Sequence, residues 1–133
     1  MILPDTSAWI EYLNATEGPA DRRLRSIFEV DEPVVLSEVV VMEVLAGVPS
    51  ERDAVTTRSA ILEFPIVPLR GLTDFEEAAR IYRTCRAAGE TVRKMTDCLV
   101  AVAALRADAS VLHLDRDFDV IARHTDLRIE PVA

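Results

Sequence analysis

Short strand-like stretches alternate with helical patterns along this 133-residue chain, and the alternation restricts its possible folds more than any other feature. The strand-like stretches lie at residues 2–5, 34–36, 66–69, 111–114 and 127–129. Helical patterns lie between them, at residues 7–14, 20–30, 37–48, 50–63, 73–89, 95–107 and 118–124. Strands that alternate with helices form a parallel sheet with helices on both faces. We therefore predict an α/β fold with a twisted parallel sheet of four to five strands, in a single domain over residues 1–133.

The formal net charge of −8 is opposite in sign to the basic surface of most nucleic-acid-binding proteins. A divalent cation bound among several of the acids would reverse the field locally. No apolar run reaches the roughly 18 to 20 residues of a membrane span, so we expect no membrane association and a cytoplasmic protein. Cys85 and Cys98 lack the spacing of zinc ligands or of a disulfide framework, which predicts two reduced packing residues.

Two acids directly follow predicted strands. Asp5 ends the first stretch, and Asp115 ends the stretch at 111–114. Open α/β sheets bind their ligands at the carboxyl ends of the strands, so both acids are candidates for a functional site. Each also has a structural interpretation, because Asp5, Thr6 or Ser7 would cap the first helix, and one acid of the next run would cap the helix that follows Asp115. That run contains Asp115, Asp117 and Asp119.

Two further acids lie on apolar helix faces. The neighbours of Glu43 at helical spacing are Val39, Val40, Ala46 and Gly47, which predicts that Glu43 points along a buried stripe. Asp97 begins a nearly continuous apolar helix, although an acid in a first helical turn also interacts favourably with the helix dipole. An unpaired buried carboxylate costs several kcal/mol, so such positions indicate a bound partner.

Together these acids predict one metal centre. Carboxylate oxygens suit Mg²⁺ or Mn²⁺, and the chain has no set of Cys and His ligands for zinc. We assign Asp5, Glu43, Asp97 and Asp115 to the site, with Asp117 as a possible further ligand. A divalent cation would activate water against a phosphodiester, so His113 needs no catalytic role.

Four sequence motifs resemble those of PIN-domain proteins, in particular the VapC-type toxins. They are Met-Ile-Leu-Pro-Asp-Thr-Ser-Ala-Trp, Ser-Glu-Val-Val-Val-Met-Glu-Val-Leu-Ala-Gly, Gly-Glu-Thr-Val-Arg-Lys-Met-Thr-Asp-Cys-Leu-Val-Ala and His-Leu-Asp-Arg-Asp-Phe-Asp. The resemblance implies a PIN-like fold and a Mg²⁺- or Mn²⁺-dependent endoribonuclease that acts as the toxin of a type II toxin–antitoxin pair. It also implies a homodimer, a VapB-type antitoxin partner and a structured RNA substrate such as tRNA or rRNA.

The resemblance maps the family's acidic quartet onto Asp5, Glu43, Asp97 and Asp115, and its hydroxyl near the metal onto Thr6 or Ser7. Two positions depart from the family pattern, because His113 stands where a threonine is frequent and Pro4 where an aliphatic residue is common. Arg93 and Lys94 are candidates for contacts to substrate phosphate, with solvated loop residues as the alternative. A catalytically silent PIN-like module that binds RNA or protein is the alternative function.

Overall fold

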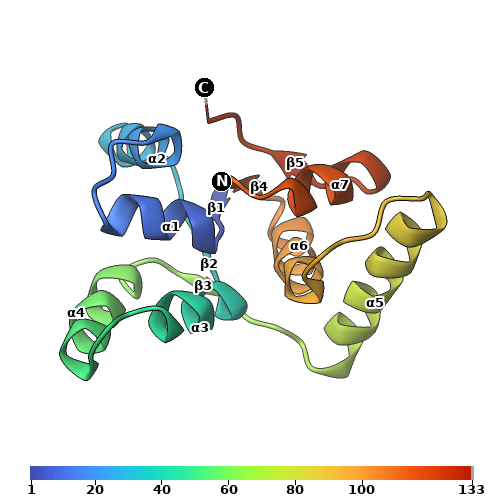
Figure 1. The fold of residues 1–133 in the computed structure, drawn as a ribbon, viewed down its shortest axis with the longest axis horizontal. Coiled ribbons are helices and arrows are strands. Elements are labelled where there is room, and N and C mark those ends of the chain that lie inside the picture. Colours follow the sequence, from blue (N-terminus) through green and yellow to red (C-terminus); the bar gives the residue numbers. More distant parts are fainter. Residues whose placement is uncertain (133) are drawn as a thin grey trace.

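The computed structural model describes residues 1–132, which form five strands and seven helices (Figure 1). The strands are β1 (Ile2–Pro4), β2 (Leu36–Ser37), β3 (Ile66–Val67), β4 (Ser110–Leu112) and β5 (Arg128–Ile129). The helices are α1 (Thr6–Leu13), α2 (Pro19–Glu29), α3 (Glu38–Ala46), α4 (Glu51–Ile61), α5 (Leu72–Ala87), α6 (Met95–Ala107) and α7 (Arg116–His124). None of these helices has the length and apolar character of a membrane span.

All strand pairings are parallel, as the sequence predicted, but the sheet is divided. β1, β4 and β5 form one part in the order β1-β4-β5, and β2 pairs with β3 in the other. A single bridge between Ile2 and Val34 joins the two parts. The strand expected at 34–36 is therefore wrong in its bounds, because Val34 forms only this bridge and regular pairing begins at Leu36.

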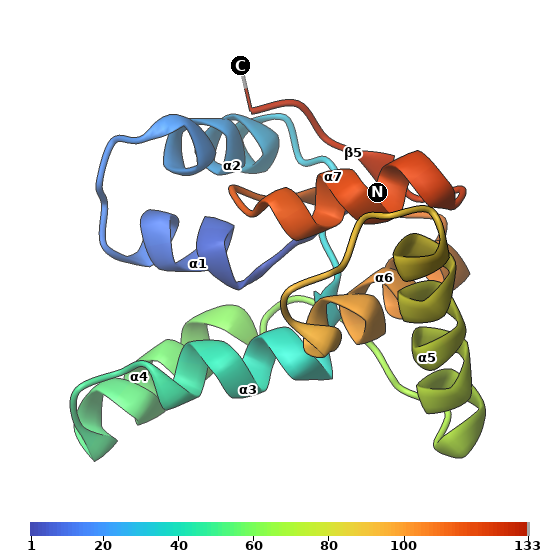
Figure 2. The same ribbon diagram turned by 45° about the vertical axis from the view of Figure 1, so that its right-hand side comes forward.

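The helices cover both faces of the sheet. The crossovers from β1 to β2 and from β2 to β3 step toward one edge, whereas those that lead to β4 and β5 step back toward the other. Because parallel crossovers are right-handed, the two sets of helices lie on opposite faces. Helices α1 to α4 accordingly pack among themselves on one side, and α5 to α7 on the other (Figures 1 and 2).

Local hydrogen bonds explain where the helices begin. The Ser37 hydroxyl accepts a hydrogen bond from the backbone N–H of Val39 at 3.2 Å, which confirms the predicted cap of α3. The first helix was predicted to be capped by Asp5, Thr6 or Ser7, and the cap is Asp5.

The core is densely apolar on both sides of the sheet. Trp9 is buried and its ring packs against those of Tyr12, Phe28 and Phe64 at centroid distances of 5.9, 6.2 and 5.7 Å. This aromatic cluster anchors α1 to α2 and to the chain after α4. Helix α6 is buried along most of its length, including Cys98, which is a free thiol.

Candidate functional site

Asp5 lies where β1 passes into α1 and has two local partners. Its Oδ1 atom accepts hydrogen bonds from the Ser7 hydroxyl at 2.6 Å and from the backbone N–H of Ala8 at 3.1 Å. The Ser7 hydroxyl in turn accepts the N–H of Leu114 at 3.0 Å, which ties this turn to the chain after β4. Asp5 is only 5% exposed, and burial raises the pKa of its carboxyl group.

Glu43 lies on α3 and is joined to the first turn of α1. The Thr6 hydroxyl donates a hydrogen bond of 2.8 Å to Oε1 of Glu43. The expectation that Glu43 points along a fully buried stripe is only partly right. Val39 and Val40 are buried, but Ala46 is exposed and Glu43 itself is half-buried, so its carboxylate lies at the border of the core.

Asp97 lies in the first turn of α6 and is 2% exposed. Its Oδ2 atom is buried and has no hydrogen-bond partner among the described residues. Burial, followed by the neighbouring Asp117 carboxylate, raises the pKa of Asp97 to about 8, and the Lys94 ammonium opposes this shift. A buried oxygen atom without a hydrogen-bond partner indicates that a bound ligand supplies the missing contact.

Asp115 and Asp117 follow β4 and have different surroundings. Asp115 is the cap of α7, and its Oδ1 atom accepts the N–H of Asp117 at 3.0 Å. Asp117 is 0% exposed, and its two oxygens accept the backbone N–H groups of Arg93 at 3.0 Å and Lys94 at 2.9 Å. Although burial acts in the opposite direction, these hydrogen bonds lower the pKa of Asp117. Asp117 therefore holds the loop that leads into α6.

The structure brings three of the candidate acids into one group. Asp97, Asp115 and Asp117 each offer a carboxylate oxygen, and these oxygens lie within 4.8 Å of one another. Asp5 and Glu43 lie outside this group. Asp5 nevertheless is close enough to Asp115 for that carboxylate to contribute to the raised pKa of Asp5.

His113 supports the same group from the end of β4. Its Nδ1 atom accepts the backbone N–H of Asp115 at 3.0 Å, and its Nε2 atom lies 3.3 Å from Oδ1 of Asp119. We expected a strand residue without catalytic duty, but β4 ends at Leu112 and His113 follows it. Its contacts are those of a residue that orients the Asp115 backbone. The sequence signal was its position two residues before an acid at a strand end.

Two cations lie beside the acids. Nη2 of Arg93 lies 3.2 Å from Oδ1 of Asp115, and its Nε lies 3.6 Å from Oδ1 of Asp117. Nζ of Lys94 lies 3.6 Å from Oδ2 of Asp115 and 3.9 Å from Oδ1 of Asp97. Both basic residues therefore contact the acidic group in this structure.

These donors fit a hard divalent cation. The convergent groups are carboxylate oxygens, the ligands that Mg²⁺ and Mn²⁺ prefer. Asp97 belongs to this group, and its buried Oδ2 atom has no hydrogen-bond partner within residues 1–132. Such an arrangement could bind a divalent cation, which would place positive charge beside a phosphate group.

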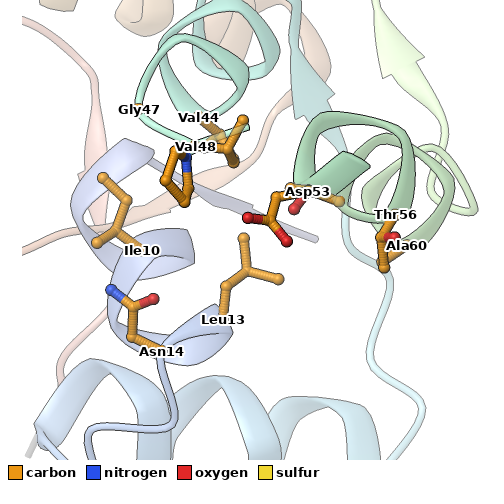
Figure 3. A pocket seen from close by; sticks show the side chains of 11 residues that line it. Ile10, Leu13, Asn14, Val44, Gly47, Val48, Asp53, Thr56 and Ala60 are labelled. Atoms are coloured by element: carbon orange, nitrogen blue, oxygen red, sulfur yellow. The ribbon is translucent and has the colours of Figure 1, made fainter. Parts of the chain in front are cut away.

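A separate cavity of about 470 Å³ lies between α1, α3 and α4 (Figure 3). Ile10, Leu13 and Val44 line its apolar part, and Asp53 contributes a carboxylate. None of the predicted catalytic acids lines this cavity. The acidic group is therefore a distinct feature of the molecule.

Comparisons with known proteins agree with this geometry. The family model described as PIN domain matches residues 2–124. Ribonuclease VapC11 of Mycobacterium tuberculosis is 41% identical over 129 residues, which cover 96% of this chain and 96% of that protein.

Two solved structures share the fold. VapBC2 from Rickettsia felis, bound to a DNA fragment from its promoter, has a TM-score of 0.74 at 15% identity and covers 98% of each chain. FitAcB from Neisseria gonorrhoeae has a TM-score of 0.75 at 20% identity and covers 99% of this chain and 98% of that one. From the match to the family model and the 41% identity, the chain belongs to the PIN-domain family, and within it to the VapC type.

Proposed function

We propose that this chain is the toxin of a type II toxin–antitoxin pair and acts as a Mg²⁺- or Mn²⁺-dependent endoribonuclease. The observation that carries the proposal is Asp97, whose Oδ2 atom is buried without a partner and whose carboxylate groups with those of Asp115 and Asp117. The 41% identity to ribonuclease VapC11 supports the same reaction class. Hydrolysis would leave a 5′-phosphate and a 3′-hydroxyl.

Asp5, Glu43, Asp97 and Asp115 would hold the cation, with Asp117 adjacent. When bound, a divalent cation supplies positive charge that stabilises the phosphate in the transition state and makes water a better nucleophile. The remaining chemistry belongs to the chain's own residues.

Those residues orient the acids and the substrate. Thr6 donates to Glu43 and keeps its carboxylate directed toward the end of β1. Ser7 links Asp5 to the chain after β4. Arg93 and Lys94, held by the buried Asp117, supply the cations that would contact the RNA phosphates and offset the acidic surroundings.

The proposal extends to partners. A VapB-type antitoxin is the proposed inhibitor, supported by the VapBC and FitAB assemblies named among the structural neighbours. An acidic group of this kind would attract a basic side chain of that antitoxin. We further propose a homodimer that acts in the cytoplasm on structured RNA such as tRNA or rRNA, with residues 1–133 forming one PIN domain.

The test is a cleavage assay with purified protein, tRNA and either Mn²⁺ or EDTA. The wild-type protein should cleave only with the metal, and Asp97→Asn should abolish cleavage and toxicity in cells. Asp5→Asn is a second informative variant, because asparagine also caps helices and preserves the start of α1. Asp126→Asn is the matched control, since Asp126 is exposed and lies after α7.

Mapping the RNA ends after brief expression would identify the cut. Metal-independent cleavage, or full activity in both Asp→Asn variants, would refute the proposed site. RNA binding without any cleavage would instead favour the catalytically silent PIN-like module.

A further inference from the structure

Lys94 is the only lysine among the 15 Lys and Arg residues of the chain, and its ammonium lies within the acidic group. Its Nζ atom is 3.6 Å from Oδ2 of Asp115 and 3.9 Å from Oδ1 of Asp97. Its backbone N–H is held by Asp117 at 2.9 Å, whereas its side chain is 52% exposed. The backbone of Lys94 is therefore anchored, and its long side chain borders solvent.

The field at the ammonium comes from all four predicted metal ligands. Burial opposes the charge, but nearby carboxylates outweigh burial and raise the pKa of Lys94. The contributing carboxylates are those of Asp97, Glu43, Asp115 and Asp5. Asp97 and Asp115, the first and third of these carboxylates, are also the two in direct contact with Nζ.

The proposed cation would bind the same two carboxylates that Lys94 contacts. Nζ lies within 4 Å of a carboxylate oxygen of each residue, so a cation held by Asp97 and Asp115 would share these carboxylates with the ammonium. Like charges at such distances repel at a protein surface, more strongly than in bulk water. The flexible four-carbon stem of lysine allows the ammonium to move outward without moving the backbone.

Arg93 differs in its contacts. Its guanidinium pairs with Asp115 and Asp117 and makes no ion pair with Asp97 among the described contacts. The unpartnered Oδ2 atom of Asp97 independently indicates that the ammonium does not complete the coordination of this carboxylate.

We propose that the ammonium of Lys94 and the divalent cation compete for the carboxylates of Asp97 and Asp115. Cation binding displaces the ammonium toward solvent, where it becomes available to a substrate phosphate. This inference rests on the proposed function in one respect, because it takes these acids as the cation site. It adds a residue that sets the affinity of the site and couples cation binding to phosphate contact.

The single lysine allows a direct measurement of this displacement. The protein would be treated briefly with acetic anhydride in EDTA or in saturating Mg²⁺, at matched ionic strength, and acetylation would be quantified by peptide mass spectrometry. We expect acetylation of Lys94 to become roughly threefold or more faster with Mg²⁺ in the wild-type protein and to stay unchanged in Asp97→Asn. The Met1 amine is the internal control. An equal Lys94 rate in EDTA and Mg²⁺ would overturn the inference.

Cation affinity gives a second and independent readout. Lys94→Met should bind Mn²⁺ roughly three- to tenfold more tightly than the wild-type protein in calorimetric titrations, because the competing charge is gone. Arg80→Met, which removes a cation paired with Glu77 on α5, should leave Mn²⁺ affinity unchanged. Equal or weaker binding by Lys94→Met would overturn the inference.

The two proposals fail in different ways. If the wild-type protein binds Mn²⁺ through Asp97 and cleaves RNA, but Lys94 shows neither effect, only the competition is refuted. If Asp97→Asn binds Mn²⁺ as tightly as the wild-type protein, the proposed cation site fails and the competition fails with it.

Discussion

The hydroxyl of Thr6 donates a hydrogen bond of 2.8 Å to Oε1 of Glu43, which lies 37 residues further along the chain. This contact joins the first turn of α1 to the middle of α3. It limits the rotation of a half-buried carboxylate that lies at the border of the core. The orientation of Glu43 therefore depends on a residue that is not itself charged.

Thr6→Val keeps the shape of the side chain and removes the hydroxyl. We expect RNA cleavage to fall roughly tenfold, because residues that orient metal-binding side chains affect activity on that scale. Stability should fall by about 1 kcal/mol. Initial cleavage rates and urea unfolding measure the two effects. Thr6→Ser restores the donor and should recover most of the lost rate, whereas wild-type cleavage by Thr6→Val would contradict this role.

Asp117→Asn tests the anchoring of the loop before α6. The N–H of Arg93 bonds Oδ1 of Asp117 and the N–H of Lys94 bonds Oδ2. Asparagine replaces one of these two oxygens with an NH₂ donor, which cannot accept the N–H group that it then faces. We expect the free energy of unfolding to decrease by roughly 2–3 kcal/mol, because a buried donor loses its partner.

Urea unfolding measures this loss, and the exposed Asp126→Asn is the control, with an expected change within about 0.5 kcal/mol. Amide hydrogen exchange at Arg93 and Lys94 is the site-specific readout. Unchanged protection of both amides in Asp117→Asn would show that another group holds the loop.

The free energy of unfolding should depend on pH through Asp97. Burial and then Asp117 raise the pKa of Asp97 from 3.8 to about 8 in the folded protein. Between these two pH values the folded state keeps a proton that the unfolded chain has released. The contribution of this proton to the free energy of unfolding is therefore full below about pH 4 and is lost as the pH rises through about 8. In EDTA, the stability of Asp97→Asn relative to wild type should increase from pH 5 to pH 8.5.

Urea titrations across this pH range provide the measurement. Parallel curves for the two proteins would contradict the raised pKa. Adding Mn²⁺ at pH 8 should stabilise the wild-type protein and leave Asp97→Asn nearly unaffected, since a ligand that binds the folded state raises its stability.

The alternation of strands and helices could be predicted because it follows from local periodicity. The structure confirms the parallel sheet, the helices on both faces and the cap at Ser37. It moves the start of the last helix from Phe118 to Arg116, because Asp115 itself caps that helix. The expected strand at 111–114 likewise ends at Leu112, where pairing with Pro4 ends.

The contacts of the site that could not be predicted from the sequence join residues far apart in the chain. Asp117 was predicted only as a possible further ligand, yet it is fully buried and bonded to backbone groups 23 and 24 residues away. No periodicity within one helix reports such contacts. The position of the Lys94 ammonium between Asp97 and Asp115 is also invisible until α6 and α7 are placed side by side.

Asp5 and Asp115 each use Oδ1 to begin a helix. That bond fixes the rotamer of the side chain, so the direction of the second oxygen is already set when the chain folds. If a cation binds at these two positions as proposed, it would immobilise little there, because the conformational entropy that it would otherwise remove has been lost beforehand. The affinity of these oxygens for a cation would then depend on how the fold orders the two side chains as well as on their charge.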